Sequence, residues 1–294
     1  MDISSQRVLR FLYPSIMASS TEIVGLIPAG GHATRLAPLP CSKELFPIGW
    51  QSDKSGEMKP KAVSSFLLDK YKAAGIRKAY FILRKGKWDI PQYYGDGEIV
   101  DMDIAYLIMN APYGHPFTLD QAFPFTKSNF VAFGYPDILF APEDAFASLI
   151  RKQSETQAAI VLGIFPLRPD QRWAIASFSD DGKIDIIAHK TPPPGIPRLG
   201  FAIAFWTPEF SLFMHDFLMG AIDKKNFVAP DGTEYTMNHV LQAAIDSGLN
   251  VQNVVFESGF VLDVGTPNDL FAAQVEQSAV AKNIIKPFSE QNIS

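Results

Sequence analysis

The chain has 294 residues, of which 47% are hydrophobic, a net charge of −5 and one cysteine, Cys41. It is long enough to bury a sizeable core, its charge provides no basic surface for non-specific nucleic-acid binding, and one cysteine excludes an internal disulfide or a cysteine-based zinc cluster. No apolar run reaches the ~18 residues of a membrane span, so we expect a cytoplasmic protein whose partners are small molecules, with no nucleic acid and no membrane.

The first twenty residues contain two arginines and an apolar patch that Pro14 interrupts. This stretch loosely imitates a targeting segment, but its apolar part is short and has no clear cleavage site. We expect residues 1–20 to be an N-terminal extension. A start near Met17 is the alternative that the sequence leaves open.

Apolar runs and helix-forming segments alternate as far as residue 165. Residues 22–28 are a short apolar run ended by turn residues, which is typical of a strand buried on both faces. Apolar residues recur at helical spacing from Val63 to Ala74, before Gly75. The predicted elements are strand 22–28, helix 63–74, strands 78–84 and 103–109, short helix 117–123, strand 129–133, helix 141–153 and strand 158–165.

The pattern changes between residues 173 and 205. Two short runs meet at Asp181 and Gly182, which predicts an antiparallel β insertion. Helices after Pro208 and over 236–247, a strand at 251–256 and a final helix from Asn268 complete the chain. Strands alternating with helices predict an α/β fold with a Rossmann-like, mostly parallel mixed sheet covered by helices.

The stretch GLIPAGGHATRLAPLPCSKELFPIG, residues 25–49, combines flexible backbone with fixed positive charge. It follows the first strand, where ligands bind in such sheets, and it is neither a Walker P-loop nor G-x-G-x-x-G. Gly30 and Gly31 let backbone N–H groups approach a phosphate, and Thr34 adds a hydroxyl. Arg35 offers a planar fork and Lys43 a mobile point charge, a combination that suits a polyphosphate.

This stretch resembles the A-G-G-x-G-T-R-L…P-K-x-L-x-P signature of the nucleoside-diphosphate-sugar pyrophosphorylases, the sugar-1-phosphate nucleotidyltransferases. The chain length is close to that of their glucose-1-phosphate thymidylyltransferase branch. Later segments match in the family's order, over about residues 24–274: APYGHPFTLDQAF with Gly114, PDILF with Asp137, AHKTP with Lys190, and FVLDVGTPNDLFAAQ with Asp263.

The resemblance implies a reaction and a set of roles. A sugar-1-phosphate attacks the α-phosphorus of a nucleoside triphosphate in line, giving an NDP-sugar and pyrophosphate. It implies that Arg35 and Lys43 are catalytic and that Lys190 binds the sugar phosphate. Asp137 and Asp263 are then the ligands of Mg²⁺, one ion or two. Nucleotide binding falls to Gly30, Gly31, Thr34 and Gly114.

The resemblance also implies one nucleotide-diphospho-sugar transferase-like domain at 21–294, and a homo-oligomer. Its nucleotide-binding half is about 21–155, its sugar-phosphate-binding half about 156–265, and its C-terminal helix 268–282.

Several positions depart from the family pattern. Ala33 replaces a loop glycine, Pro136 precedes the metal aspartate in place of glycine, and His189 replaces the glutamate before Lys190. The remaining departures are Ser42 for the proline before Lys43, Trp173 and Ala174 for Tyr-Gly, and Met109 and Asn110 for the base-facing glutamine. We interpret these changes as affecting substrate choice more than phosphate chemistry.

Simpler explanations stand beside each of these assignments. The two aspartates could cap a helix or a turn, and the basic side chains could be surface charges. We interpret His32 as a loop histidine, because phosphoryl transfer with a pyrophosphate leaving group demands no acid or base. We interpret Cys41 as a packing residue, because it lacks a positioned base partner. Two other functions stay open: a cytidylyltransferase acting on a non-sugar phosphate ester, and a non-catalytic nucleotide- or sugar-binding relative.

Overall fold

The computed structural model describes residues 22–53, 55–109, 114–168, 175–178, 184–188, 198–223, 228–229 and 231–281. The predicted N-terminal extension, the hairpin turn at Asp181 and Gly182, and Lys190 lie outside these residues. Among the described helices, none is long and apolar enough to cross a membrane.

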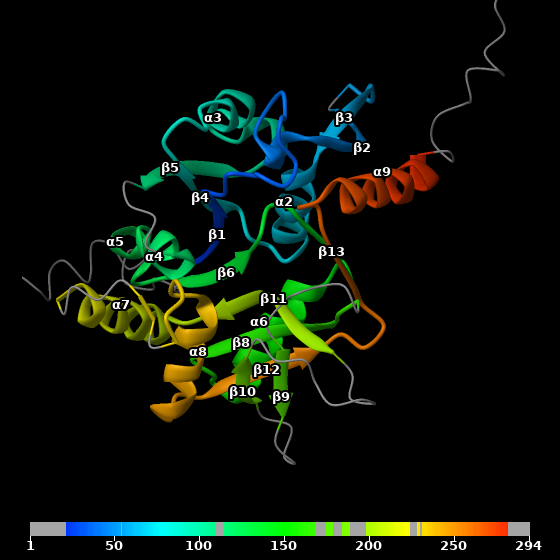
Figure 1. Cartoon of the computed structure of the whole chain (residues 1–294). Helices are drawn as coiled ribbons and strands as arrows, with labels where there is room; N and C mark the ends of the chain where they lie inside the picture. The colour runs from blue at the N-terminus through cyan, green and yellow to red at the C-terminus, as the bar shows by residue number, and fades with distance from the viewer. Residues whose placement is uncertain are drawn as a thin grey trace, which may run out of the picture.

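A seven-stranded mixed sheet runs through the centre of the protein (Figure 1). Its order is β12-β8-β11-β6-β1-β4-β5. Every neighbouring pair is parallel except the two that β11 makes, with β6 and with β8. The predicted α/β fold with a mostly parallel mixed sheet is therefore confirmed. The strands are β1 (Ile23–Ala29), β4 (Lys78–Arg84), β5 (Asp103–Met109), β6 (Phe130–Gly134), β8 (Ile160–Pro166), β11 (Leu199–Trp206) and β12 (Val251–Val255).

Both faces of the sheet are buried because alternate residues of its strands enter two different hydrophobic cores. In β1, Val24 and Leu26 enter one core, and Ile27 and Ala29 enter the other. The first core includes buried residues of α4 (His115–Asp120), α7 (Pro208–Asp223) and α8 (Met237–Asp246), with α5 (Phe123–Thr126) packed beside α7. The second includes residues of α2 (Val63–Ala73), α3 (Asp89–Tyr94) and α6 (Ala145–Thr156).

Three antiparallel pairs lie outside the main sheet. They are β2 (Pro47–Ser52) with β3 (Met58–Ala62), β7 (Ile138–Ala141) with β13 (Phe260–Asp263), and β9 (Ile175–Phe178) with β10 (Ile184–Ala188). The last pair is the predicted β insertion, whereas β2, β3, β7 and β13 were not predicted. The final helix, α9 (Pro267–Ala281), packs against β2.

Two predicted helices were placed wrongly. The helix predicted at 141–153 is α6, which begins at Ala145, because Ala141 still pairs with Phe260 in the β7–β13 ladder. The single helix predicted at 117–123 is two short helices, α4 and α5. Proline stands near the start of both, at Pro116 and Pro124, where its missing N–H costs no hydrogen bond.

The strand order reverses direction around β1. From β1 the chain goes to β4 and β5 on one side and to β6 on the other. Crevices beyond the carboxyl ends of strands at such a point are where ligands bind in α/β sheets. The loop after Ala29 and the turn after Gly134 leave the sheet there.

Candidate active site

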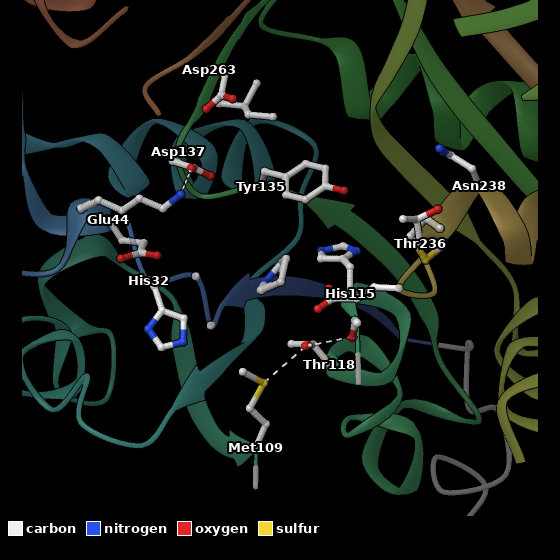
Figure 2. A pocket seen from close by; sticks show the side chains of 18 of the residues that line it. His32, Glu44, Met109, His115, Thr118, Tyr135, Asp137, Thr236, Asn238 and Asp263 are labelled. Atoms are coloured by element: carbon white, nitrogen blue, oxygen red, sulfur yellow. Dashed lines mark hydrogen bonds and ion pairs between the residues drawn. The ribbon is translucent and has the colours of Figure 1, made fainter. Parts of the chain in front are cut away.

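A cavity of about 690 Å³ opens at this point of the sheet. Its volume is within the roughly 300–1,000 Å³ usual for ligand sites. Its walls come from the loop after β1, the β6–β7 turn and the starts of α4 and α8 (Figure 2). Seven of the predicted site residues line it: Gly30, Gly31, Arg35, Lys43, Gly114, Asp137 and Asp263.

Two predicted site residues are not among this lining. Thr34 is exposed on the loop, between the partly buried Ala33 and the exposed Arg35. Lys190 lies outside the described residues. The structure brings seven of the nine predicted residues together in one cavity wall, and the hydroxyl of Thr34 is not part of that wall.

Lys43 and Asp137 form an ion pair in the cavity wall. The Lys43 ammonium donates a hydrogen bond to Asp137 Oδ2, and the two side chains are only 17% and 11% exposed. Burial alone lowers the pKa of Lys43, but the Asp137 carboxylate outweighs burial and the pKa is raised. Lys43 is therefore a fixed cation at neutral pH.

Asp263 lies beside Asp137 because β13, which ends at Asp263, pairs with β7, which begins directly after Asp137. Asp263, the last residue of β13, faces Ile138 in the ladder, and the N–H of Val264 donates to the Asp137 carbonyl at 2.8 Å. Burial, and next the charge of Asp137, raise the pKa of Asp263 to about 6. Asp137 follows the end of β6 by three residues and directly precedes β7.

Arg35 approaches the same carboxylate pair from the solvent side. Its Nη2 is 3.8 Å from Asp263 Oδ2, and its side chain is 65% exposed. A Cβ on Gly265 would stand 2.7 Å from that guanidinium nitrogen, so the glycine leaves room for Arg35. The exposed guanidinium is held loosely and is free to turn toward a ligand.

The carboxylate pair fits a hard divalent cation. Among the described residues, no group of three or more His, Cys, Asp or Glu could hold a metal. Mg²⁺ needs no such group, because it binds through one or two carboxylates together with waters and substrate phosphates. Burial first, and next the charge of Asp137, raise the pKa of Asp263, and a cation bound between the two carboxylates would oppose both effects.

A buried ion pair beneath Lys43 was not predicted. Lys87 donates to both carboxylate oxygens of Glu44, at 2.6 and 2.7 Å, and both side chains are almost fully buried. Ser64 Oγ donates to the Glu44 carbonyl at 2.6 Å. These contacts fix the short 3-10 turn Lys43–Leu45 that carries Lys43. An acid directly after the key lysine was the only signal for it in the sequence.

The opposite side of the cavity contains one predicted site residue, Gly114, and borders a second, Gly30, whose Cβ would stand 4.0 Å from Thr118 Cγ2. Gly114 has φ +112, and a Cβ there would stand 2.3 Å from the Tyr235 carbonyl, because the two residues form an isolated β-bridge. This bridge joins the start of α4 to the start of α8. The side chains on this side that sequence reasoning missed are His115, Thr118, Tyr135, Phe201, Thr236 and Asn238.

The fold and the cavity define an α/β protein with a ligand-sized cavity, lined by Arg35, Lys43, Asp137 and Asp263, at the switch point of its sheet. The chain belongs to the nucleotidyl transferase family, whose model matches residues 24–279.

Two curated relatives match at low identity. The glucose-1-phosphate thymidylyltransferase of Streptomyces antibioticus is 24% identical over 257 residues, which cover 83% of this chain and 63% of that protein. The low-salt glycan biosynthesis nucleotidyltransferase Agl11 of Haloferax volcanii is 23% identical over 256 residues, covering 85% and 64%. The match thus spans less than two thirds of the length of either relative.

Solved structures share the fold. A Bacillus anthracis protein assigned as a glucose-1-phosphate thymidylyltransferase, in complex with sucrose, superposes with a TM-score of 0.68 at 18% identity, over 87% of this chain and 95% of that one. The UTP-bound UGPase of Acinetobacter baumannii gives a TM-score of 0.70 at 13% identity, and the superposition covers 90% of this chain and 99% of that one.

Proposed function

We propose that the chain is a sugar-1-phosphate nucleotidyltransferase. A phosphate oxygen of the sugar-1-phosphate attacks the α-phosphorus of a nucleoside triphosphate. The bond between the α-phosphorus and its bridging oxygen breaks, and pyrophosphate leaves with the electron pair. No covalent enzyme intermediate is needed, so catalysis rests on positioning and on charge stabilisation.

The observation that carries this proposal is the ion pair of Lys43 with Asp137, set beside Asp263 and Arg35 at the carboxyl ends of β1 and β6. Lys43 neutralises charge at the α-phosphate, and the exposed guanidinium of Arg35 binds the leaving pyrophosphate. Asp137 and Asp263 would hold Mg²⁺, which neutralises phosphate charge when bound. Gly30 and Gly31 give the nucleotide close access to backbone N–H groups.

Lys190 is assigned to the sugar phosphate on the resemblance alone. The two curated relatives are named for nucleotidyl transfer, one of them to glucose-1-phosphate, and a UGPase shares the fold. These likenesses support the reaction type but not a particular base or sugar.

The proposal is tested by pyrophosphate release across a panel. Each of the common ribo- and deoxyribonucleoside triphosphates is paired with hexose-1-phosphates and, separately, with non-sugar phosphate esters, all with Mg²⁺. We expect release with at least one hexose-1-phosphate. Release only with a phosphoalcohol and CTP would favour the cytidylyltransferase alternative, and calorimetric binding without release from any pair would favour the non-catalytic one.

A further inference from the structure

The cavity has one charged side and one neutral side. Arg35, Lys43, Asp137 and Asp263 lie together on the charged side, with the Glu44–Lys87 pair behind them. The neutral side carries uncharged polar and apolar groups (Figure 2), apart from Glu234, which is exposed at the rim. The phosphates of any ligand are drawn to the charged side, so its uncharged part faces the neutral one.

His115 is the unusual residue on the neutral side. Both of its ring nitrogens are buried, and neither has a hydrogen-bond partner in the described part of the chain. The ring stacks on Tyr135 with centroids 5.0 Å apart and meets the edge of Phe133 at 5.8 Å. A buried polar group left unpaired destabilises a fold, so an imidazole without a hydrogen-bond partner in a cavity wall requires an explanation.

The two neighbouring threonine hydroxyls already have hydrogen-bond partners within the protein. Thr118 Oγ1 donates to Met109 Sδ at 3.3 Å, and Thr236 Oγ1 bonds His239 Nδ1 at 3.1 Å within the α8 capping box. These groups are already used to hold the cavity wall together. In the described part of this wall, His115 thus has buried ring nitrogens that are left for an external partner.

We propose that His115 hydrogen bonds a hydroxyl group of a sugar ring bound in the cavity, and so helps to select the substrate. This inference rests on the proposed function and deepens it. The sugar ring is the ribose of the nucleotide or the hexose of the sugar phosphate.

The chemistry of the imidazole matches a hydroxyl. Burial lowers the pKa of His115 to about 4, against a small opposing effect of Asp137, so the ring is neutral at pH 7. A neutral imidazole offers one N–H donor and one acceptor nitrogen, and a hydroxyl can serve as partner to either. A half-turn about Cβ–Cγ keeps the shape of the ring and exchanges its nitrogens with carbons, so a nitrogen can face the ligand without backbone movement.

The test compares steady-state kinetics of the wild type with those of His115→Phe, His115→Asn and His115→Gln. Phenylalanine keeps the stacking on Tyr135 but removes both nitrogens. Asparagine and glutamine restore a polar group at about the reach of Nδ1 and of Nε2. We expect His115→Phe to raise KM for one sugar-bearing substrate about 10- to 100-fold while kcat changes less than threefold, and one amide variant to recover part of the loss.

Deoxy substrates identify the ring that His115 contacts. The wild type should discriminate against the deoxy form of the substrate it contacts, and His115→Phe should lose that discrimination. If His115→Phe no longer discriminates between ribo- and 2′-deoxyribonucleoside triphosphates, His115 contacts the ribose. If it loses discrimination only against a deoxyhexose-1-phosphate, His115 contacts the transferred sugar.

Stability separates binding from a structural role. If His115 serves a ligand, His115→Phe should leave the melting temperature of the free protein unchanged or higher, since it removes an unpaired polar group. A lower melting temperature with unchanged KM for both substrates would overturn the inference, as would KM values and discrimination within twofold of wild type. No pyrophosphate release by the wild type would instead contradict the proposed function itself.

Discussion

Ala33 has a left-handed backbone conformation, with φ 52, in the loop that follows β1. Its carbonyl accepts hydrogen bonds from the N–H groups of Leu36 at 3.0 Å and Ala37 at 3.1 Å, which hold the loop in this shape. An alanine in this conformation is strained by about 1–2 kcal/mol, which glycine avoids. The resemblance placed a family glycine at this position, and the loop keeps a shape that suits glycine.

Ala33→Gly should therefore stabilise the protein. The relief of strain exceeds the entropy that glycine adds to the unfolded chain, so we expect a gain of about 0.5–1 kcal/mol. Urea unfolding measures this gain in the free energy of unfolding. Ala243→Gly, in the middle of α8, is the control, and it should lower the free energy of unfolding by about 1 kcal/mol. Equal losses in both variants would show that the loop is not strained.

Lys43 is the residue on which the proposed chemistry depends most. Lys43→Ala should lower kcat for pyrophosphate release by about 10²- to 10³-fold, the range for removing one preorganised group that stabilises transition-state charge. Lys59→Ala, which removes an exposed partner of Glu57, should leave kcat within twofold. Rates near wild type in folded Lys43→Ala would remove Lys43 from the mechanism.

His115 should make stability depend on pH. Its pKa is about 4 when folded and near 6.5 when unfolded, so between these values the unfolded chain binds the extra proton. Above pH 6.5 His115 leaves the free energy of unfolding unchanged. As the pH falls below 6.5, protonation of the unfolded chain lowers the free energy of unfolding, by about 3 kcal/mol near pH 4. Urea midpoints measured from pH 7.5 to 4.5 should fall less steeply in His115→Phe. Identical slopes in both proteins would show that the imidazole is protonated in the fold.

Among the elements, those with strong local patterns were predictable. Strands β1 and β8 are continuous apolar runs with both faces buried, β4 and the edge strand β5 are mostly apolar, and α2 has a clear helical period. The strands β7 and β13 have four residues each and exist because they pair with each other across more than 100 residues of chain. No window of sequence contains that pairing.

The same division holds within the candidate site. The glycine loop, Arg35 and Lys43 lie close together in the sequence, so their spacing alone predicted a phosphate site. The neutral side was not predictable because His115, Tyr135 and Thr236 come from three separate segments. They meet only once the Gly114–Tyr235 bridge brings α4 against α8.

Gly114→Ala tests how much the cavity depends on that bridge. The new Cβ would stand 2.3 Å from a backbone carbonyl, so α4 and α8 must separate, at a cost of about 2–4 kcal/mol including backbone strain. Gly75 also has a positive φ, +79, but it has open space around it. Gly75→Ala should therefore lower the free energy of unfolding only by the backbone strain, about 1 kcal/mol. Urea unfolding gives both values. If Gly114→Ala loses no more stability than Gly75→Ala, α4 and α8 separate at the bridge at little cost in free energy.

For the whole molecule, ligand binding and folding are linked through the sheet. The cavity is built from the loop after β1, the β6–β7 turn, β13 and α8, which span residues 30 to 263 of the chain. A nucleotide held there contacts segments that must all be folded at once. It should therefore stabilise the whole fold, because it binds the folded state and not the unfolded chain.

Magnesium should govern this stabilisation through the two aspartates. At a nucleotide concentration about 100 times Kd the gain is roughly 2.7 kcal/mol, or a rise in Tm of roughly 4–5 °C for a chain of this size. We expect thermal unfolding with nucleoside triphosphate and Mg²⁺ to show this rise, excess EDTA to remove most of it, and Asp263→Asn to show little rise in either condition. Asp101→Asn changes an exposed side chain that pairs with Arg77 and is not part of the cavity lining, so this variant should respond like wild type. A full rise in EDTA would mean that Asp137 and Asp263 hold no metal during nucleotide binding, and Lys43 and Arg35 would then carry the phosphate charge alone.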